Sequence, residues 1–125
     1  MFEQDSVKKQ VRQLGNALAM ILFHKPLDTQ SAYSMESLDK QAHASELLRK
    51  IDSGKIREAE ADLLDSIGSK TMDDLLTGIT FYEHLADKSE SFLDDHAYNS
   101  VDLKLGARRF ADRLGGAEIA RLFFT

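Results

Sequence analysis

Cysteine and tryptophan are both absent from this chain of 125 residues, and proline occurs once. The absence of cysteine excludes disulfides, thiolate zinc sites, iron–sulfur clusters and cysteine nucleophiles. It also agrees with a reducing compartment, so the cytoplasm is the location that we expect. The one proline, Pro26, cannot continue a helical hydrogen-bond ladder and therefore predicts a helix boundary just before it.

Long apolar runs are absent as well. The longest apolar block, Ala17–Phe23, has seven residues, whereas a membrane-spanning helix needs about 20. The first residues, Met1–Asp5, lack the basic stretch of a secretory signal, and no small-residue cleavage pattern follows the apolar block. We therefore expect neither a membrane span nor a secretory leader.

Basic residues do not balance the acidic ones, and the formal net charge is -5. Residues 1–27 and 96–125 each carry +2, whereas residues 28–95 carry -9. An acidic middle segment argues against a nucleic-acid footprint there. Two basic rows near the C-terminus leave a weak nucleic-acid accessory role as one alternative, although an acidic protein or intramolecular partner suits them better; these rows comprise Lys104, Arg108, Arg109 and Arg113.

Helical periodicity dominates what is present. In the stretch up to Phe23, apolar residues recur at alternating steps of four and three, which is typical of a helix with an apolar seam; they are Val7, Val11, Leu14, Leu18 and Ile21. Met20 and Phe23 lie nearly opposite this seam, so the second half of the helix is apolar almost all round. A helix of that kind is normally buried on both sides.

The rest of the chain shows further helical patterns separated by glycine, serine and asparagine, and Thr71 and Asn99-Ser100 are predicted N-caps. Their predicted ranges are Met35–Asp52, Lys55–Ile67, Met72–Asp87, Phe92–Tyr98 and Val101–Leu114, followed by a docked helical turn or two in the apolar tail. The predicted inward residues of the second and third helices are Leu38, Ala42, Leu47, Leu48 and Ile51, then Ile56, Ala59, Leu63 and Ile67. Those of Val101–Leu114 are Leu103, Ala107, Phe110 and Leu114. We therefore predict one compact all-α domain over residues 1–125, a bundle of five to seven helices with Val7–Phe23 at its centre.

One helix face gathers candidate metal ligands, namely Glu36, Asp39, His43 and Glu46. Carboxylates with an imidazole would suit iron or manganese. A di-metal helical bundle, however, needs Glu-x-x-His units, and the chain has none. The face also continues into Lys50, a favourable i,i+4 partner for Glu46. We therefore interpret this face as a solvated charged surface and expect no bound metal.

Two further groups place carboxylates beside imidazoles, as general-base catalysis requires. They are Glu83 and His84 with Asp87, and the run Asp94–His96. Neither group has a nucleophile or an oxyanion loop beside it. We expect His84 to be a partly buried, hydrogen-bonded side chain, and His96 to end its short helix near the negative dipole end.

Two stretches carry resemblances to known families. Gly54–Ala59, followed by Leu63-Leu64, resembles the inter-helix corner of a tetratricopeptide repeat, which implies one antiparallel helical hairpin. The opening Met1–Asp5 before a long helix, together with Phe92–His96 and Leu114-Gly115, resembles a group of short all-helical bacterial proteins classed as a domain of unknown function. That resemblance implies a fold and no activity.

These observations favour a protein-interaction or scaffold domain that associates with itself, as a homodimer, and has no catalytic activity or cofactor. A small helical enzyme or metal-binding protein using histidine and carboxylate residues is the alternative. Met20 and Phe23, opposite the seam, would form part of an exposed apolar patch if nothing covered them. Either the apolar tail covers them, or a second copy of the chain does. The predicted interaction residues are Met20, Phe23, Ile119, Leu122, Phe123 and Phe124.

Overall fold

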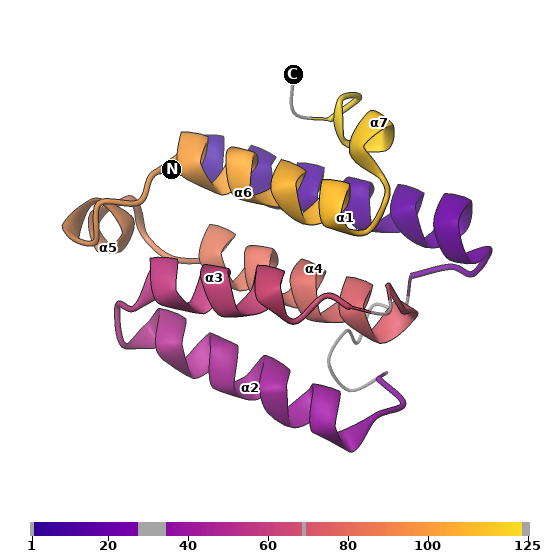
Figure 1. The fold of residues 1–125 in the computed structure, drawn as a ribbon. Coiled ribbons are helices and arrows are strands. Elements are labelled where there is room, and N and C mark those ends of the chain that lie inside the picture. Colours follow the sequence, from indigo (N-terminus) through magenta and orange to yellow (C-terminus); the bar gives the residue numbers. More distant parts are fainter. Residues whose placement is uncertain (1, 28–34, 69, 124–125) are drawn as a thin grey trace.

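A computed structural model describes residues 2–27, 35–68 and 70–123, and within these ranges the chain forms seven helices and no strand (Figure 1). The helices are α1 (Phe2–Phe23), α2 (Leu38–Asp52), α3 (Ile56–Asp65), α4 (Met72–Ala86), α5 (Glu90–Asp95), α6 (Ser100–Arg113) and α7 (Ala117–Ala120). The predicted all-α bundle is confirmed. No helix in the described ranges has both the length and the apolar character needed to cross a membrane.

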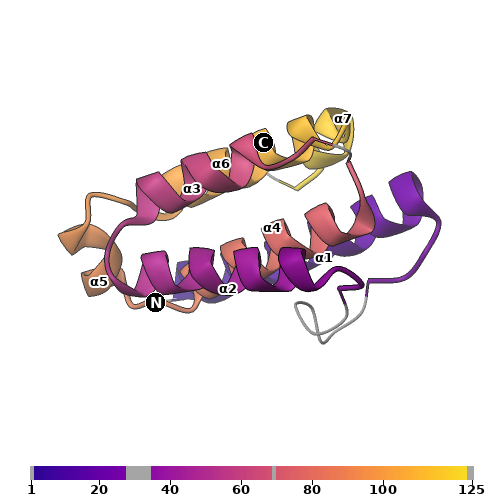
Figure 2. The same ribbon diagram turned by 60° about the horizontal axis from the view of Figure 1, so that its bottom comes forward.

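The helices form two layers, which Figure 2 shows nearly edge-on. One layer contains α2, α4 and α1, and the other contains α3 and α6 with α7 at its end. Within the first layer α4 lies between α1 and α2, and α6 covers it from the second layer. We predicted that Val7–Phe23 would be central, and this is wrong. The apolar residues of α4 surround its axis more completely, so it takes the position with neighbours on most sides.

The seam of α1 is confirmed over most of its length, because Val7, Val11, Leu14 and Leu18 are all at most 1% exposed. The last seam residue, Ile21, was predicted to be buried but is 57% exposed. It borders a groove that also contains Gly115 and Gly116, at the turn after α6. Because glycine has no side chain, this turn cannot cover Ile21.

The predicted hairpin is formed by α2 and α3, which lie side by side (Figure 1). Gly54 lies between them with φ +86°, and its N–H bonds to Ile51 while the next N–H bonds to Lys50. This is the Schellman arrangement that ends a helix at a residue of positive φ. The further likeness to a tetratricopeptide repeat stays a prediction.

Only some of the α2 residues that were predicted to face inward are buried. Ala44, Leu47 and Ile51 are buried, whereas Leu38 is 78% exposed and Ala42 is also exposed. The helix begins after Ser37, whose side chain caps it, so Leu38 occupies the first helical position, away from the face that packs on α4. The inward residues of α3 agree better, since Ile56, Ala59 and Leu63 are buried and Ile67, beyond its end, packs against the core.

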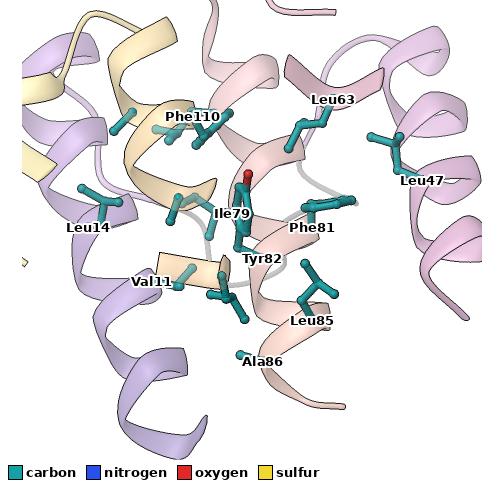
Figure 3. Close-up of a cluster of buried hydrophobic side chains, with 14 of the residues drawn as sticks. Val11, Leu14, Leu47, Leu63, Ile79, Phe81, Tyr82, Leu85, Ala86 and Phe110 are labelled. Atoms are coloured by element: carbon teal, nitrogen blue, oxygen red, sulfur yellow. The ribbon is translucent and has the colours of Figure 1, made fainter. Parts of the chain in front are cut away.

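Buried side chains of α4 and α6 meet in the core, with others from α1, α2 and α3 around them (Figure 3). All four predicted inward residues of α6 are buried, namely Leu103, Ala107, Phe110 and Leu114. The ring of Phe110 lies on Gly78 of α4, where an added Cβ would stand 1.9 Å from the ring. Tyr82 is next to it, with ring centroids 6.0 Å apart. A glycine in the middle of α4 therefore sets how closely the two layers approach.

Candidate functional site

A carboxylate lies inside the bundle. Glu60 of α3 is 5% exposed, and its Oε2 accepts hydrogen bonds from the hydroxyls of Tyr82 (2.7 Å) and Tyr98 (3.1 Å). Tyr82 belongs to α4, and Tyr98 precedes α6, so the cluster joins both layers. A Cβ at Gly106 of α6 would stand 1.9 Å from the same oxygen. The glycine therefore leaves the space that the carboxylate occupies.

Both tyrosines are held in their neutral form. Burial raises the pKa of Tyr82 well above its usual value, and the charge of Glu60 raises it further. The pKa of Tyr98 is raised by the same two causes. Arg57 lies 5.3 Å from the centre of the Tyr98 ring and bonds to the carbonyl of Ala97. The cluster thus combines two neutral donors with one acceptor, an arrangement that joins helices and offers no activated nucleophile.

Sequence reasoning missed Glu60, although a signal for it was present. Ile56, Ala59 and Leu63 were recognised as the inward face of α3, and Glu60 lies one step from Ala59 at the i+4 position from Ile56. A glutamate in that register is on the buried stripe. Two tyrosines elsewhere in an apolar register were its possible partners, because buried tyrosine hydroxyls usually have a hydrogen-bond partner.

The four candidate metal ligands do not all lie on one helix face. Glu36 lies before the helix, and its N–H bonds to Asp73 of α4. Glu46 accepts from Arg49, whereas Lys50, predicted to pair with Glu46, bonds to Asp62 of α3. Among the residues that the structure describes, no group of three or more metal-binding side chains comes together.

Glu83, His84 and Asp87 do not form a common site either, because each side chain pairs with a residue of another helix. Glu83 forms a two-oxygen ion pair with Arg12 of α1, at 2.8 and 3.0 Å. His84 Nε2 lies 2.7 Å from Asp52 of α2. Asp87 pairs with Lys8 at 2.7 Å. His84 is partly buried and hydrogen-bonded as predicted, and the three residues link α4 to both of its neighbours in the layer.

The second group, Asp94–His96, forms the C-terminal end of α5. His96 is the C-cap of α5, as predicted, and its Nδ1 lies 2.7 Å from the carbonyl oxygen of Phe92. The other side of the ring faces Gly54, where an added Cβ would stand 2.3 Å from Nε2. His96 therefore packs α5 against the hairpin turn, and Asp94 and Asp95 point elsewhere, exposed.

The basic residues that were predicted to form two rows on α6 have different surroundings. Arg113 donates to the carbonyl of Leu64, 3.0 Å away, and so ties α6 to the end of α3. Arg108 and Arg109 instead line a groove between α6 and α7, which Arg121 also borders. Sequence spacing could not add Arg121 to this group, because only the turn at Gly115 brings α7 back along α6.

The predicted interaction residues lie at the C-terminal half of α1 and around α7, with different exposures. Met20 is 53% and Leu122 79% exposed, whereas Phe23, Ile119 and Phe123 are partly buried against the core. The tail docks in the predicted manner at Phe123, whose carbonyl accepts from Gln10 at 3.1 Å. The described part of the tail leaves Met20 uncovered. Phe124 lies outside the described residues.

A groove adjoins these side chains, with a volume of about 360 Å³. Ile21, Leu22 and Ile119 form its apolar lining, and Asp112 and Glu118 are also on its border. We call the apolar side chains Met20, Ile21, Ile119 and Leu122, at the C-terminal end of α1 and around α7, the α1–α7 face. Ile21 and the partly buried Ile119 line the groove, and Met20 and Leu122 are exposed outside its lining. The α1–α7 face adds Ile21, for which the seam pattern predicted the core, to the predicted interaction residues.

The fold and these sites define an all-helical bundle whose recognisable polar clusters join helices and whose largest exposed apolar side chains include those of the α1–α7 face. The chain belongs to the family of unknown function DUF6483, whose family model matches residues 1–115. The resemblance to a domain of unknown function is thereby confirmed, and the match ends just before α7. No curated protein and no solved structure matches the chain.

Proposed function

We propose that this chain is a protein-association domain that pairs with a second copy of itself through the α1–α7 face. The observation that carries the proposal is the exposure of two consecutive large apolar residues, Met20 and Ile21, at 53% and 57%. Leu122, three residues after the groove-lining Ile119, is 79% exposed. Adjacent exposed side chains of this size are typical of a surface that another protein covers.

The charge distribution favours a second copy over an unrelated partner. Charged residues make up 30% of the chain, yet the stretch Gln10–His24 contains one, Arg12, and Glu83 already pairs with it. In a twofold contact, residues near the axis meet their own equivalents, so a charged surface there would repel itself. The α1 part of the face, which has no unpaired charge, lacks that penalty, and depletion of charge is characteristic of interface centres.

The apolar face also combines a projecting residue with a hollow. Leu122 is among the most exposed large apolar residues described, and the adjacent groove has room for a side chain. In a twofold pair, Leu122 of each copy can enter the groove beside Ile21 of the other. One surface then supplies both halves of the contact, as isologous association requires.

The test is the molar mass in solution, measured by light scattering after size exclusion at tens of micromolar protein. We expect a dimer for the wild type and a monomer of unchanged helix content for the double variant Met20→Glu, Ile21→Glu. The control is Leu38→Glu, which introduces one such charge at a leucine 78% exposed on α2. A monomeric wild type contradicts the proposal, and so does a dimer that Leu38→Glu dissociates while the double variant does not.

A further inference from the structure

Three arginines border a second groove, which shares Asp112 and Ala117 with the apolar groove. Arg108 and Arg109 lie on α6, and Arg121 directly follows α7. The groove has a volume of about 400 Å³, in the range of small-molecule sites. Asp112 is the acidic residue on its lining, so the lining carries a formal net charge of +2 in a chain of -5.

These three arginines differ from the other four in the chain. Each of the other four has a hydrogen-bonded partner inside the protein: Arg12 with Glu83, Arg49 with Glu46, Arg57 with the carbonyl of Ala97, and Arg113 with the carbonyl of Leu64. Arg108, Arg109 and Arg121 have neither a hydrogen bond nor an ion pair within residues 2–27, 35–68 and 70–123. Within the part of the chain that the structure describes, the guanidinium groups without a hydrogen bond or ion pair are therefore those gathered at one groove, although the charge of Arg109 also acts on the pKa of Tyr82.

Their spacing indicates what kind of anion would engage them. Consecutive residues on a helix project about 100° apart, so Arg108 and Arg109 cannot both grip one small oxyanion in the same way. A guanidinium group binds a phosphate through two parallel N–H···O hydrogen bonds. A ligand with two or three linked phosphates can reach guanidinium groups that diverge in this manner, with Arg121 closing the groove from α7.

The groove also has an apolar part. Leu105 is 42% exposed beside the arginines, and Ala117 and Ala120 of α7 line the same hollow. Small alanine side chains leave room for the uncharged portion of a ligand, and Leu105 offers it an apolar contact. We propose that the groove between α6 and α7 binds a small organic ligand bearing a diphosphate or triphosphate group, of which a nucleoside triphosphate is the representative.

A nucleic-acid strand suits the groove less well than a small ligand. A strand needs a row of cations that continues along the surface, but Arg113 of α6 is turned toward Leu64 and Lys104 already interacts with another group of the protein. Asp112 lies on the border of both grooves, and Glu118 lines the neighbouring one. The positive charge is therefore local to Arg108, Arg109 and Arg121, which suits one polyphosphate better than a strand.

The experiment is a fluorescence-anisotropy titration of the full chain with a methylanthraniloyl derivative of ATP, at low salt where charge interactions are least screened. We expect saturable binding that the double variant Arg109→Gln, Arg121→Gln weakens at least about 10-fold, because hydrogen bonds to charged groups are lost. Asp112→Asn removes a repulsive charge and should tighten binding about 3-fold. The control Arg49→Gln removes one arginine charge from α2 and should change affinity by less than about 2-fold.

Two competitors separate the parts of the proposal. Inorganic triphosphate should displace the probe at a higher concentration than ATP does, because it lacks the group that contacts Leu105. A single-stranded oligonucleotide that displaces the probe at a lower concentration than ATP would overturn the assignment to a small ligand. So would the absence of saturable binding, or an equal loss in Arg49→Gln. Circular dichroism of each variant checks that the helices are intact, and the dimer test is independent of every one of these results.

Discussion

The hydroxyl of Tyr82 donates a 2.7 Å hydrogen bond to the carboxylate of Glu60, and both groups lie inside the bundle. A buried hydrogen bond of this kind stabilises modestly when complete, but a donor left without an acceptor is costly. Since Tyr98 donates to the same oxygen, one carboxylate satisfies two buried donors.

Replacing Glu60 with leucine should therefore lower the free energy of unfolding by about 1–3 kcal/mol, because the Tyr82 hydroxyl loses its acceptor and that of Tyr98 keeps only the carbonyl of Asp102, 3.5 Å away. Urea denaturation at neutral pH measures the change. Glu58→Leu, on an exposed position of the same helix, is the control and should cost less than about 0.5 kcal/mol. Adding Tyr82→Phe and Tyr98→Phe to Glu60→Leu should recover part of the loss. Equal stability of the Glu60 and Glu58 variants would refute this role.

The two buried tyrosines should remain protonated until the protein unfolds. Their pKa values are raised in the folded state, whereas unfolded tyrosines ionise near pH 10. Their contribution to stability is therefore complete below about pH 10 and is lost as the pH rises above it. In a Tyr33→Phe background, the tyrosinate absorbance at 295 nm should rise together with the loss of the helical circular dichroism signal. Ionisation of both groups while the helices persist would contradict the cluster.

The close approach of α4 and α6 predicts a strong effect of one methyl group. Gly78→Ala places a Cβ against the ring of Phe110, and such overpacking typically costs about 1–3 kcal/mol. Gly68→Ala is the matched control, because no atom lies within 4 Å of its added Cβ. That variant should be neutral or slightly stabilising, through the lower entropy of the unfolded chain. Thermal unfolding of the two variants in parallel measures the difference.

Asp52 should contribute a stability that disappears in acid. Burial acts to raise its pKa, but hydrogen bonds from Lys88 and His84 outweigh burial and leave the pKa below its usual value of 3.8. Its contribution is therefore present above pH 3.8 and is lost as the pH falls through the lower, folded-state value. Asp52→Asn should cost about 0.5–1 kcal/mol at pH 7, because the group is half exposed and screened by water.

The control for this prediction is Asp65→Asn on α3, which makes the same change of charge at an exposed residue. Urea denaturation from pH 7 down to about pH 3 should show the cost of Asp52→Asn shrinking, while Asp65→Asn stays near zero throughout. A cost that is constant over this range would show that the carboxylate charge of Asp52 is not what stabilises the fold.

Most of the helices could be predicted because local signals agreed with burial. Thr71 and Asn99 were recognised as caps, and both form reciprocal capping boxes with an aspartate three residues later. Apolar spacing also placed Leu103, Ala107 and Phe110 correctly on one face of α6. These properties depend on residues within one or two turns, so the sequence alone contains them.

The errors arise where a neighbouring element decides burial. Ile21 continues the seam of α1, but the glycines opposite it leave it uncovered. Leu38 has the right residue type for a core, but it stands at the first position of α2. Glu60 and Arg121 acquire their partners only when distant helices meet. Periodicity identifies a face of a helix and does not specify what, if anything, covers it.

The central position of α4 has a consequence for how the bundle opens. Its flanking helices come from both ends of the chain, with α1 on one side, α2 on the other and α6 above. No short segment can therefore detach and expose α4, and its backbone amides can exchange with deuterium only when the whole bundle opens. The four residues of α7 lie at the margin, where a local opening would suffice. Mass-resolved exchange should thus show α4 as the slowest region and α7 as a separate, fast one.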